Sequence, residues 1–258
     1  MSAPRLFVER PLGAGQSLPL EAAQAHYLRT VLRLGPGGAV RVFNGVDGEW
    51  SARLAGGRQP TLEVADRQRP QAAEPGPTLL VAPIKKPRLE WLLEKAVELG
   101  VARIVPVITE RSVVRPDASH RLRLRAVEAA EQCGRLTVPS LAEPAPLAAA
   151  VTEAATLGPL AFADEAGGGV PLIAALEAGP LDVFLIGPEG GFAPAVRRAL
   201  LAREWVVPVS LGRTILRAET AAVYAVACWR GLADRRAGCG AGDSSPTMRA
   251  ASTGGDSR

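Results

Sequence analysis

The sequence contains little cysteine and little histidine, and both shortages narrow what the chain can be. Its 258 residues include 3 cysteines, without any Cys-x-x-Cys pair, and 2 histidines. Neither a disulfide framework nor a zinc site is supported, so we expect no metal and a reducing compartment. A histidine general base is available only from His26 or His120, both far in sequence from the two glycine loops described below.

Long apolar runs are missing as well. No stretch is long enough to cross a bilayer. The N-terminal segment carries Arg5, Glu9 and Arg10 and does not have the apolar core of a signal peptide. We therefore expect a cytoplasmic protein without a membrane anchor.

What the chain does have is a hydrophobic content of 47% and a net charge of +4. The first is ample for a sizeable core. The second is compatible with a polyanionic partner such as nucleic acid. Lysine occurs only at Lys85, Lys86 and Lys95, and the abundance of arginine, alanine, glycine and proline is equally explained by a GC-rich genome.

A proline-rich segment at residues 71–78 divides the chain into two regions. Residues 1–70 contain short alternating strands separated by glycine turns, which predict a small β-barrel with one helix over 21–33. Residues 79–235 alternate between strand and helix patterns, which predicts an α/β domain with a mostly parallel sheet and helices on both faces. Residues 236–258 are rich in glycine and serine and are expected to be a disordered tail.

Two glycine loops follow predicted strands late in the chain. The apolar run at 183–186 ends in Gly-Pro-Glu-Gly-Gly-Phe, and the next strand ends in LGRTILRAETAA. Glycines at the carboxyl end of a parallel strand let a ligand approach the backbone, although a tight turn into the next helix is the simpler explanation for either loop alone. The first α/β strand lacks G-x-G-x-x-G, so a dinucleotide-binding oxidoreductase remains a remote alternative.

The paired words GPEGGF and LGRTILRAETAA resemble the late motifs of the SPOUT class of S-adenosylmethionine-dependent RNA methyltransferases, and within that class the RsmE family. Further similar words are HYLRTVLRLGPGG (26–38), EKAVELGV (94–101), VITERS (107–112), and EQCGR followed by VPSL (131–141). The resemblance implies a PUA-like barrel followed by a SPOUT domain with a deep trefoil knot, an exception to the rule that chains do not thread. It also implies a homodimer that methylates N3 of a uridine in small-subunit ribosomal RNA, with that RNA or the 30S subunit as its partner.

The resemblance assigns roles to particular residues. Main-chain groups of both loops would bind S-adenosylmethionine, and the leucines are as readily explained by core packing. The expected cofactor-binding residues are Ile186, Gly187, Pro188, Glu189, Gly190, Gly191, Leu211, Gly212, Ile215, Leu216 and Thr220. These positions would be glycine because the knot loops and the cofactor pack directly against the main chain, where a side chain would be in the way.

Arg217 and Glu189 are the candidate catalytic residues. Uridine N3 must lose a proton before it is alkylated, and a guanidinium can stabilise the resulting anion through two parallel hydrogen bonds. An ion pair of Arg217 with Glu219 or Glu189 that only holds the loops together is the alternative. The family often has Leu-Gly-x-Arg-Ile-Leu-Arg where this chain has Leu-Gly-Arg-Thr-Ile-Leu-Arg, so the role of Arg213 is open.

Basic and polar residues outside the glycine loops are candidates for RNA contact. Arg29 and Arg33 are four residues apart and would share one helical face, which a solvated surface would also explain. The candidate RNA-binding residues are Arg5, Arg10, His26, Arg29, Arg33, Gln132 and Arg135. Two further alternatives for the whole chain stay open: a ribose 2′-O methyltransferase of the SPOUT class, and an RNA-binding assembly factor with an inactive cofactor pocket.

Overall fold

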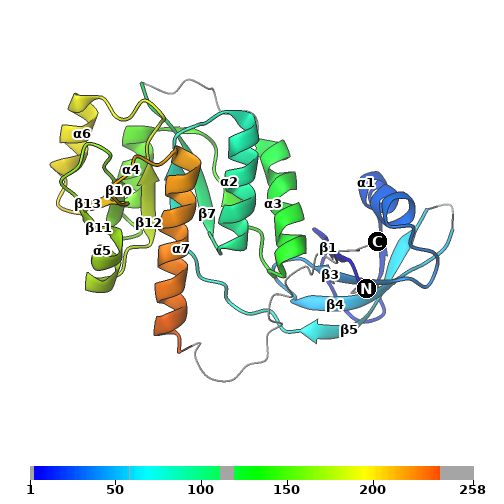
Figure 1. Cartoon of the computed structure of the whole chain (residues 1–258). Coiled ribbons are helices and arrows are strands. Elements are labelled where there is room, and N and C mark those ends of the chain that lie inside the picture. Colours follow the sequence, from blue (N-terminus) through cyan, green and yellow to red (C-terminus); the bar gives the residue numbers. More distant parts are fainter. Residues whose placement is uncertain (1–2, 58, 111–118, 239–258) are drawn as a thin grey trace, which may run out of the picture.

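Two separate sheets organise the chain (Figure 1). One hydrophobic core packs against the first sheet, and two cores cover the two faces of the second. The computed structural model describes residues 3–57, 59–110 and 119–238. The first sheet belongs to the N-terminal region and the second to the α/β region, as the sequence pattern predicts. No helix in these described ranges is both long and apolar enough to cross a membrane.

The N-terminal sheet has five strands in the order β1-β3-β4-β5-β2. It curls around a small core that includes Leu28 and Leu62, both fully buried. The described edge strands β1 and β2 do not pair with each other, so the predicted barrel is a half-barrel. The sequence patterns missed β2, which has one buried residue. The strands are β1 (Arg5–Phe7), β2 (Ser17–Pro19), β3 (Ala39–Phe43), β4 (Glu49–Leu54) and β5 (Thr61–Arg69).

The helix predicted over 21–33 is present but irregular. A short α-helix, α1 (Ala22–His26), continues as a π-helix, η1 (Tyr27–Val31). The wider turn is visible in the hydrogen bond from the Leu32 amide to the Tyr27 carbonyl, at 2.9 Å. Arg33 lies beyond the helix with φ of 53°, so the expectation that Arg29 and Arg33 share a helical face is wrong.

The second sheet is parallel in every pair, in the order β11-β13-β10-β12-β6-β7-β8, with β9 beside β7. The predicted parallel α/β sheet is therefore confirmed. Its central strands are buried on both faces, which explains their unbroken apolar sequences. The strands are β6 (Thr78–Val81), β7 (Arg103–Ile108), β8 (Ser140–Leu141), β9 (Ala145–Pro146), β10 (Leu160–Ala163), β11 (Val170–Pro171), β12 (Val183–Ile186) and β13 (Val206–Ser210).

Helices cover both faces of this sheet. The core on one face takes buried residues from α2, α3, α5 and α7, and the core on the other face takes them from α4 and α6. Figure 1 shows α2 between α3 and α7. Helix α7 runs on to Arg236, into the start of the predicted tail, and residues 239–258 lie outside the described ranges. The helices are α2 (Lys86–Glu98), α3 (Ser119–Cys133), α4 (Leu147–Ala154), α5 (Leu172–Ala178), α6 (Pro194–Leu201) and α7 (Ala218–Arg236).

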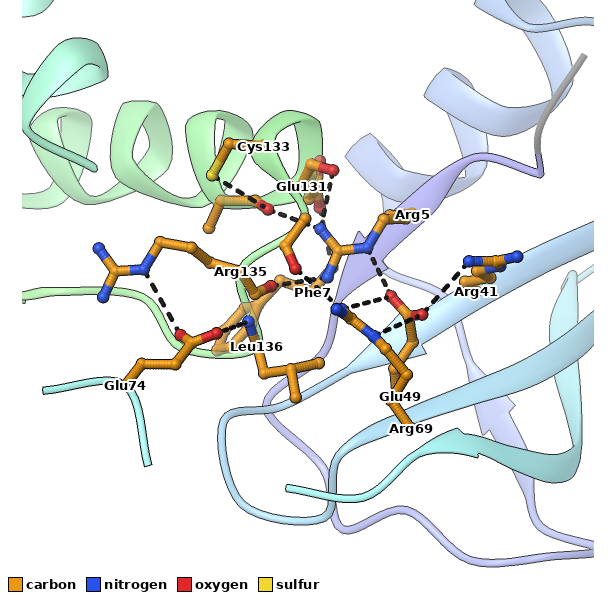
Figure 2. A network of polar contacts seen from close by, with 12 residues as sticks. Arg5, Phe7, Arg41, Glu49, Arg69, Glu74, Glu131, Cys133, Arg135 and Leu136 are labelled. Carbon is orange, nitrogen blue, oxygen red and sulfur yellow. Dashed lines mark hydrogen bonds and ion pairs between the residues drawn. The ribbon is translucent and has the colours of Figure 1, made fainter. Parts of the chain in front are cut away.

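A polar network joins the two regions (Figure 2). Arg5 of β1 donates to Glu49 at 2.6 Å. It also donates to the carbonyl oxygens of Ala130 and Glu131 in the last turn of α3, and of Arg135 just after it, at 2.6 to 2.9 Å. Glu49 is fully buried, and burial alone would raise its pKa. The hydrogen bonds and charges of Arg5 and Arg69 outweigh burial, and they hold the pKa of Glu49 below its usual value.

Candidate active site

Three neighbouring parallel strands end at one cavity. β10 lies between β12 and β13 in the sheet, although both strands follow it in sequence, so the direction of strand addition reverses at β10. Open α/β sheets bind ligands at such a reversal, beyond the carboxyl ends of the strands. The cavity there has a volume of about 470 Å³. That volume falls within the range of roughly 300–1,000 Å³ typical of small-molecule sites.

Both glycine loops line this cavity, as the sequence predicts. Leu211 and Leu216 also pack against the core, so the two explanations offered for them hold together. The expected cofactor-binding and catalytic residues that line it are Ile186, Gly187, Pro188, Glu189, Leu211, Gly212, Ile215, Leu216 and Arg217.

Three expected cofactor-binding residues do not line the cavity. Thr220 is exposed on α7, and its neighbour Ala221 lines the cavity instead. Gly190 is exposed at the tip of its loop. Gly191 lines a different, mainly apolar cavity of about 270 Å³ between α4 and α6, together with Phe192 and Leu200. These three residues lie outside the lining of this cavity, and their contact with the cofactor stays a prediction.

The glycines of the first loop lack a side chain for different structural reasons. A Cβ on Gly187 would lie 2.5 Å from the ring of Phe192, and a Cβ on Gly191 would overlap the Glu165 carboxylate. Gly191 also has φ of 65°, which favours glycine. At Gly190 a Cβ would meet no protein atom within 4 Å. Close packing within the protein thus explains Gly187 and Gly191, and it does not explain Gly190.

The sequence patterns did not point to the loop after β10 as part of the site. Asp164 and Glu165 both line the cavity. Asp164 is buried and accepts a bidentate ion pair from Arg197 of α6, with the closest contact at 2.6 Å. This pairing raises the pKa of the Arg197 guanidinium and fixes the β10 loop against α6. Two carboxylates directly after an apolar strand were the available signal.

Arg88, on the first turn of α2, is the other missed residue. It lines the cavity and forms an ion pair with Glu189, and its Nε lies 3.6 Å from Oε1 of Glu219. Glu219 is buried, and its Oε2 has no hydrogen-bond partner among the described residues. The ion pairs considered for Arg217 are therefore made by Arg88 instead.

Arg217 is left available at the cavity. It caps the N-terminus of α7, where its carbonyl oxygen accepts the Ala221 amide at 2.8 Å. Its side chain is exposed and forms no hydrogen bond or ion pair with any described residue. A guanidinium in this position can donate to a ligand in the cavity without first breaking a contact within the protein.

The structure does not favour three of the candidate RNA-binding residues. Arg5 is committed to the network of Figure 2. Arg135 is buried and donates to the Val97 and Val101 carbonyl oxygens at 3.0 and 2.8 Å. Gln132 lies in a groove lined by four glutamates, which would repel phosphate. We therefore withdraw RNA contact for Arg5, Gln132 and Arg135.

The other four candidates are on the surface of the N-terminal domain. Arg10, His26, Arg29 and Arg33 are all exposed. Within the described ranges, none of these side chains has a hydrogen bond or an ion pair. They remain free to meet an anionic partner, and their contact with RNA stays a prediction.

Comparison with known proteins identifies the family. A model described as an RNA methyltransferase domain matches residues 74–230, and a model described as an RNA methyltransferase PUA domain matches residues 20–64. The chain belongs to the RNA methyltransferase family. Its relatives in this family include ribosomal RNA small subunit methyltransferase E of Rickettsia conorii, which is 30% identical over 86% of this chain and 93% of the relative. The protein of the same name from Synechocystis sp. is 33% identical over 82% of this chain and 72% of the relative. The resemblance to the RsmE family is confirmed.

Solved structures of RNA methyltransferase relatives share the whole fold. Ribosomal RNA small subunit methyltransferase E from Neisseria gonorrhoeae, bound to S-adenosyl methionine, is 28% identical with a TM-score of 0.79. A putative methyltransferase from Legionella pneumophila, in complex with the same cofactor, is 30% identical with a TM-score of 0.78. Each match covers 90% of this chain and 98% of the other.

Proposed function

We propose that the protein methylates N3 of a uridine in small-subunit ribosomal RNA, with S-adenosylmethionine as the methyl donor. The observation that carries this proposal is the cavity at the β12-β10-β13 reversal, lined by both glycine loops of the family. Its volume suits a nucleoside-sized ligand. Its lining combines apolar side chains with the main chain of Gly187 and Gly212. These features support binding of the cofactor that the two relatives hold.

The reaction needs a nitrogen lone pair at uridine N3. When bound, the cofactor supplies a methyl group on a positively charged sulfur, which leaves as a neutral thioether. The N3 proton is lost first, and the negative charge that remains spreads over the two flanking carbonyl oxygens. Arg217 can donate to one of these oxygens and stabilise the anion. Glu189 is held by Arg88, so we assign it to positioning the loop and leave the proton acceptor to solvent.

The quaternary arrangement and the threading of the chain are part of the proposal. We infer an isologous homodimer and a trefoil knot at the two glycine loops, as in the SPOUT class. Ile215 supports the dimer, because this apolar side chain lines the cavity yet is 89% exposed, and a second chain would cover it. A substrate in ribosomal RNA supports a cytoplasmic location for the protein.

Two measurements test the function. Isothermal titration of the purified chain with S-adenosylmethionine is expected to give saturable binding, whereas an inactive pocket would give none. Mass spectrometry of small-subunit ribosomal RNA from a strain lacking the protein is expected to show the loss of N3-methyluridine. Retention of that nucleoside with loss of a ribose 2′-O-methyl group would favour the ribose methyltransferase instead.

A further inference from the structure

The rim of the cofactor cavity carries cations that the protein itself does not use. Lys85 and Lys86 stand at the start of α2, and Arg213 lies in the loop after β13. All three are exposed. Across the part of the chain that the structure describes, their side chains form no hydrogen bond or ion pair.

The sheet topology brings these residues to one place. Val81 pairs with Ile186, and the Ala82 amide donates to the Ile186 carbonyl at 3.1 Å, so the loops after β6 and β12 leave the sheet at the same edge. From the first of these loops, α2 begins with Lys86, and Arg88 on its first turn reaches Glu189.

The loop after β13 joins the same rim. Arg88 also lies beside Glu219, which follows the Arg213–Arg217 segment, and Arg213 lines the same cavity as Arg88. The two lysines therefore lie two and three residues before Arg88, which lines the cavity, and Arg213 is itself a lining residue.

Most of the acidic groups on this surface are already paired. Glu189 and Glu219 share Arg88, and Asp164 is paired with Arg197. Glu165, the other acid that lines the cavity, has its carboxylate against Gly191. The available charge at the rim is thus positive.

We propose that Lys85, Lys86 and Arg213 bind RNA phosphates on either side of the nucleotide that enters the cavity. This proposal rests on the proposed function, because it needs RNA as the substrate. Lysine and arginine bind the sugar-phosphate backbone without reading its sequence, which positions a strand while other groups select the base. The rim then acts as a second RNA-binding surface, separate from that of the N-terminal domain. It also gives a role to Arg213, which departs from the usual family motif.

Charge reversal tests the rim. Dissociation constants for transcribed small-subunit ribosomal RNA are measured at several KCl concentrations, for wild type, Lys85→Glu/Lys86→Glu and Arg213→Glu. Each lost phosphate contact removes about one unit from the slope of log Kd against log salt, so we expect a decrease of about 2 for the lysine pair and about 1 for Arg213. Affinity at low salt should fall by about tenfold or more in the lysine variant.

A matched control and two further measurements separate the outcomes. Arg230→Glu reverses an exposed charge on the later part of α7, away from the cavity lining, and is expected to keep the wild-type slope. The melting temperature and the affinity of the lysine variant for S-adenosylmethionine are expected to stay at wild-type values. An unchanged salt slope in both rim variants, or a loss of cofactor affinity without a loss of RNA affinity, would overturn the proposal. Failure of the wild type itself to methylate RNA would instead overturn the proposed function.

Discussion

Arg88 of α2 forms an ion pair with Glu189 on the loop after β12, and the same guanidinium lies beside Glu219 of α7. One side chain therefore connects three elements that surround the cofactor cavity. Glu219 is 8% exposed, and Arg88 is the only described cation within ion-pair distance of it. A buried carboxylate without that cation would be destabilising.

The first prediction concerns Arg88. Arg88→Met should lower the free energy of unfolding by about 1–3 kcal/mol, because Glu219 would lose its charged partner. It should also weaken binding of S-adenosylmethionine, because the glycine loop would no longer be fixed to α2. Chemical denaturation and isothermal titration measure the two effects.

The partner substitution tests the cause. Arg88→Met/Glu219→Gln should recover most of the lost stability, because the uncompensated charge is removed. Arg230→Met is the control, since it breaks an exposed pair with Asp234 and should change stability by about 0.5 kcal/mol or less. If Arg88→Met were as stable as this control, Arg88 would not hold the loops together.

The second prediction separates two glycines of one loop. Gly187→Ala should weaken cofactor binding by about tenfold or more, because its Cβ would lie 2.5 Å from the Phe192 ring and push the loop out of place. Gly190→Ala is the matched control, since a Cβ there has open space. Titration of both folded variants with S-adenosylmethionine decides, and equal affinities would contradict the packing argument.

The third prediction concerns pH and Glu131, at the end of α3 in the network of Figure 2. Burial raises the pKa of Glu131 from 4.5 to about 7, although the Phe7 amide donates to its carboxylate at 2.8 Å. Below pH 4.5 the group is protonated in both the folded and the unfolded states, so it has no effect on stability. As the pH rises from 4.5 through 7, the unfolded chain releases this proton more easily than the folded chain. Stability should therefore fall across this range, by up to about 3 kcal/mol.

A Glu131→Gln variant should lose this pH dependence. Glutamine keeps an oxygen for the Phe7 amide and carries no charge, so the variant should be more stable than wild type at pH 8 and similar to it at pH 4.5. Folding lowers the pKa values of Glu49 and Glu74, so these two groups make stability depend on pH only below the usual pKa of a glutamate. They therefore do not obscure the window between pH 5 and 7. A stability curve in Glu131→Gln that is parallel to that of wild type would show that Glu131 does not titrate in this range.

Much of the α/β sheet could be predicted from the sequence, because its central strands carry unbroken apolar runs. β12 has the residue range that its apolar run indicates. The strands β8, β9 and β11 have two residues each and are too short to leave a pattern. The sequence predicted a barrel, whereas the structure has a half-barrel. Strand order and closure depend on pairing between distant residues, and hydrophobic alternation does not encode that pairing.

The site was predicted where it follows from local motifs and missed where it follows from topology. The glycine loops at 187 and 212 are short sequence motifs that can be recognised locally, and both line the cavity. Arg88 and Asp164 come from segments far away in sequence, and they reach the site only because β10 and β6 lie beside β12 in the sheet. Arg5 and Arg135 show the reverse case, because neither arginine is free for a ligand. Arg5 binds a carbonyl oxygen across the two domains, and Arg135 binds one within the α/β domain.

The last prediction concerns Arg217 and the chemical step. If its guanidinium stabilises the uridine anion, Arg217→Lys should keep the charge but lose the planar pair of donors, and the methylation rate should fall by about tenfold or more. Binding of S-adenosylmethionine should change much less. The defect should shrink as the pH rises, because more of the uridine then ionises without help from the protein.

Single-turnover methylation of ribosomal RNA across pH, with enzyme in excess, measures this directly. Arg213→Lys is the matched control, because Arg213 lines the same cavity, is also exposed, and is assigned to phosphate, which lysine binds as well. It should keep the wild-type rate and pH profile. A wild-type rate in Arg217→Lys, or a defect that is constant with pH, would assign Arg217 to the structure of the loop, because only stabilisation of the anion makes the loss depend on how much uridine is already ionised.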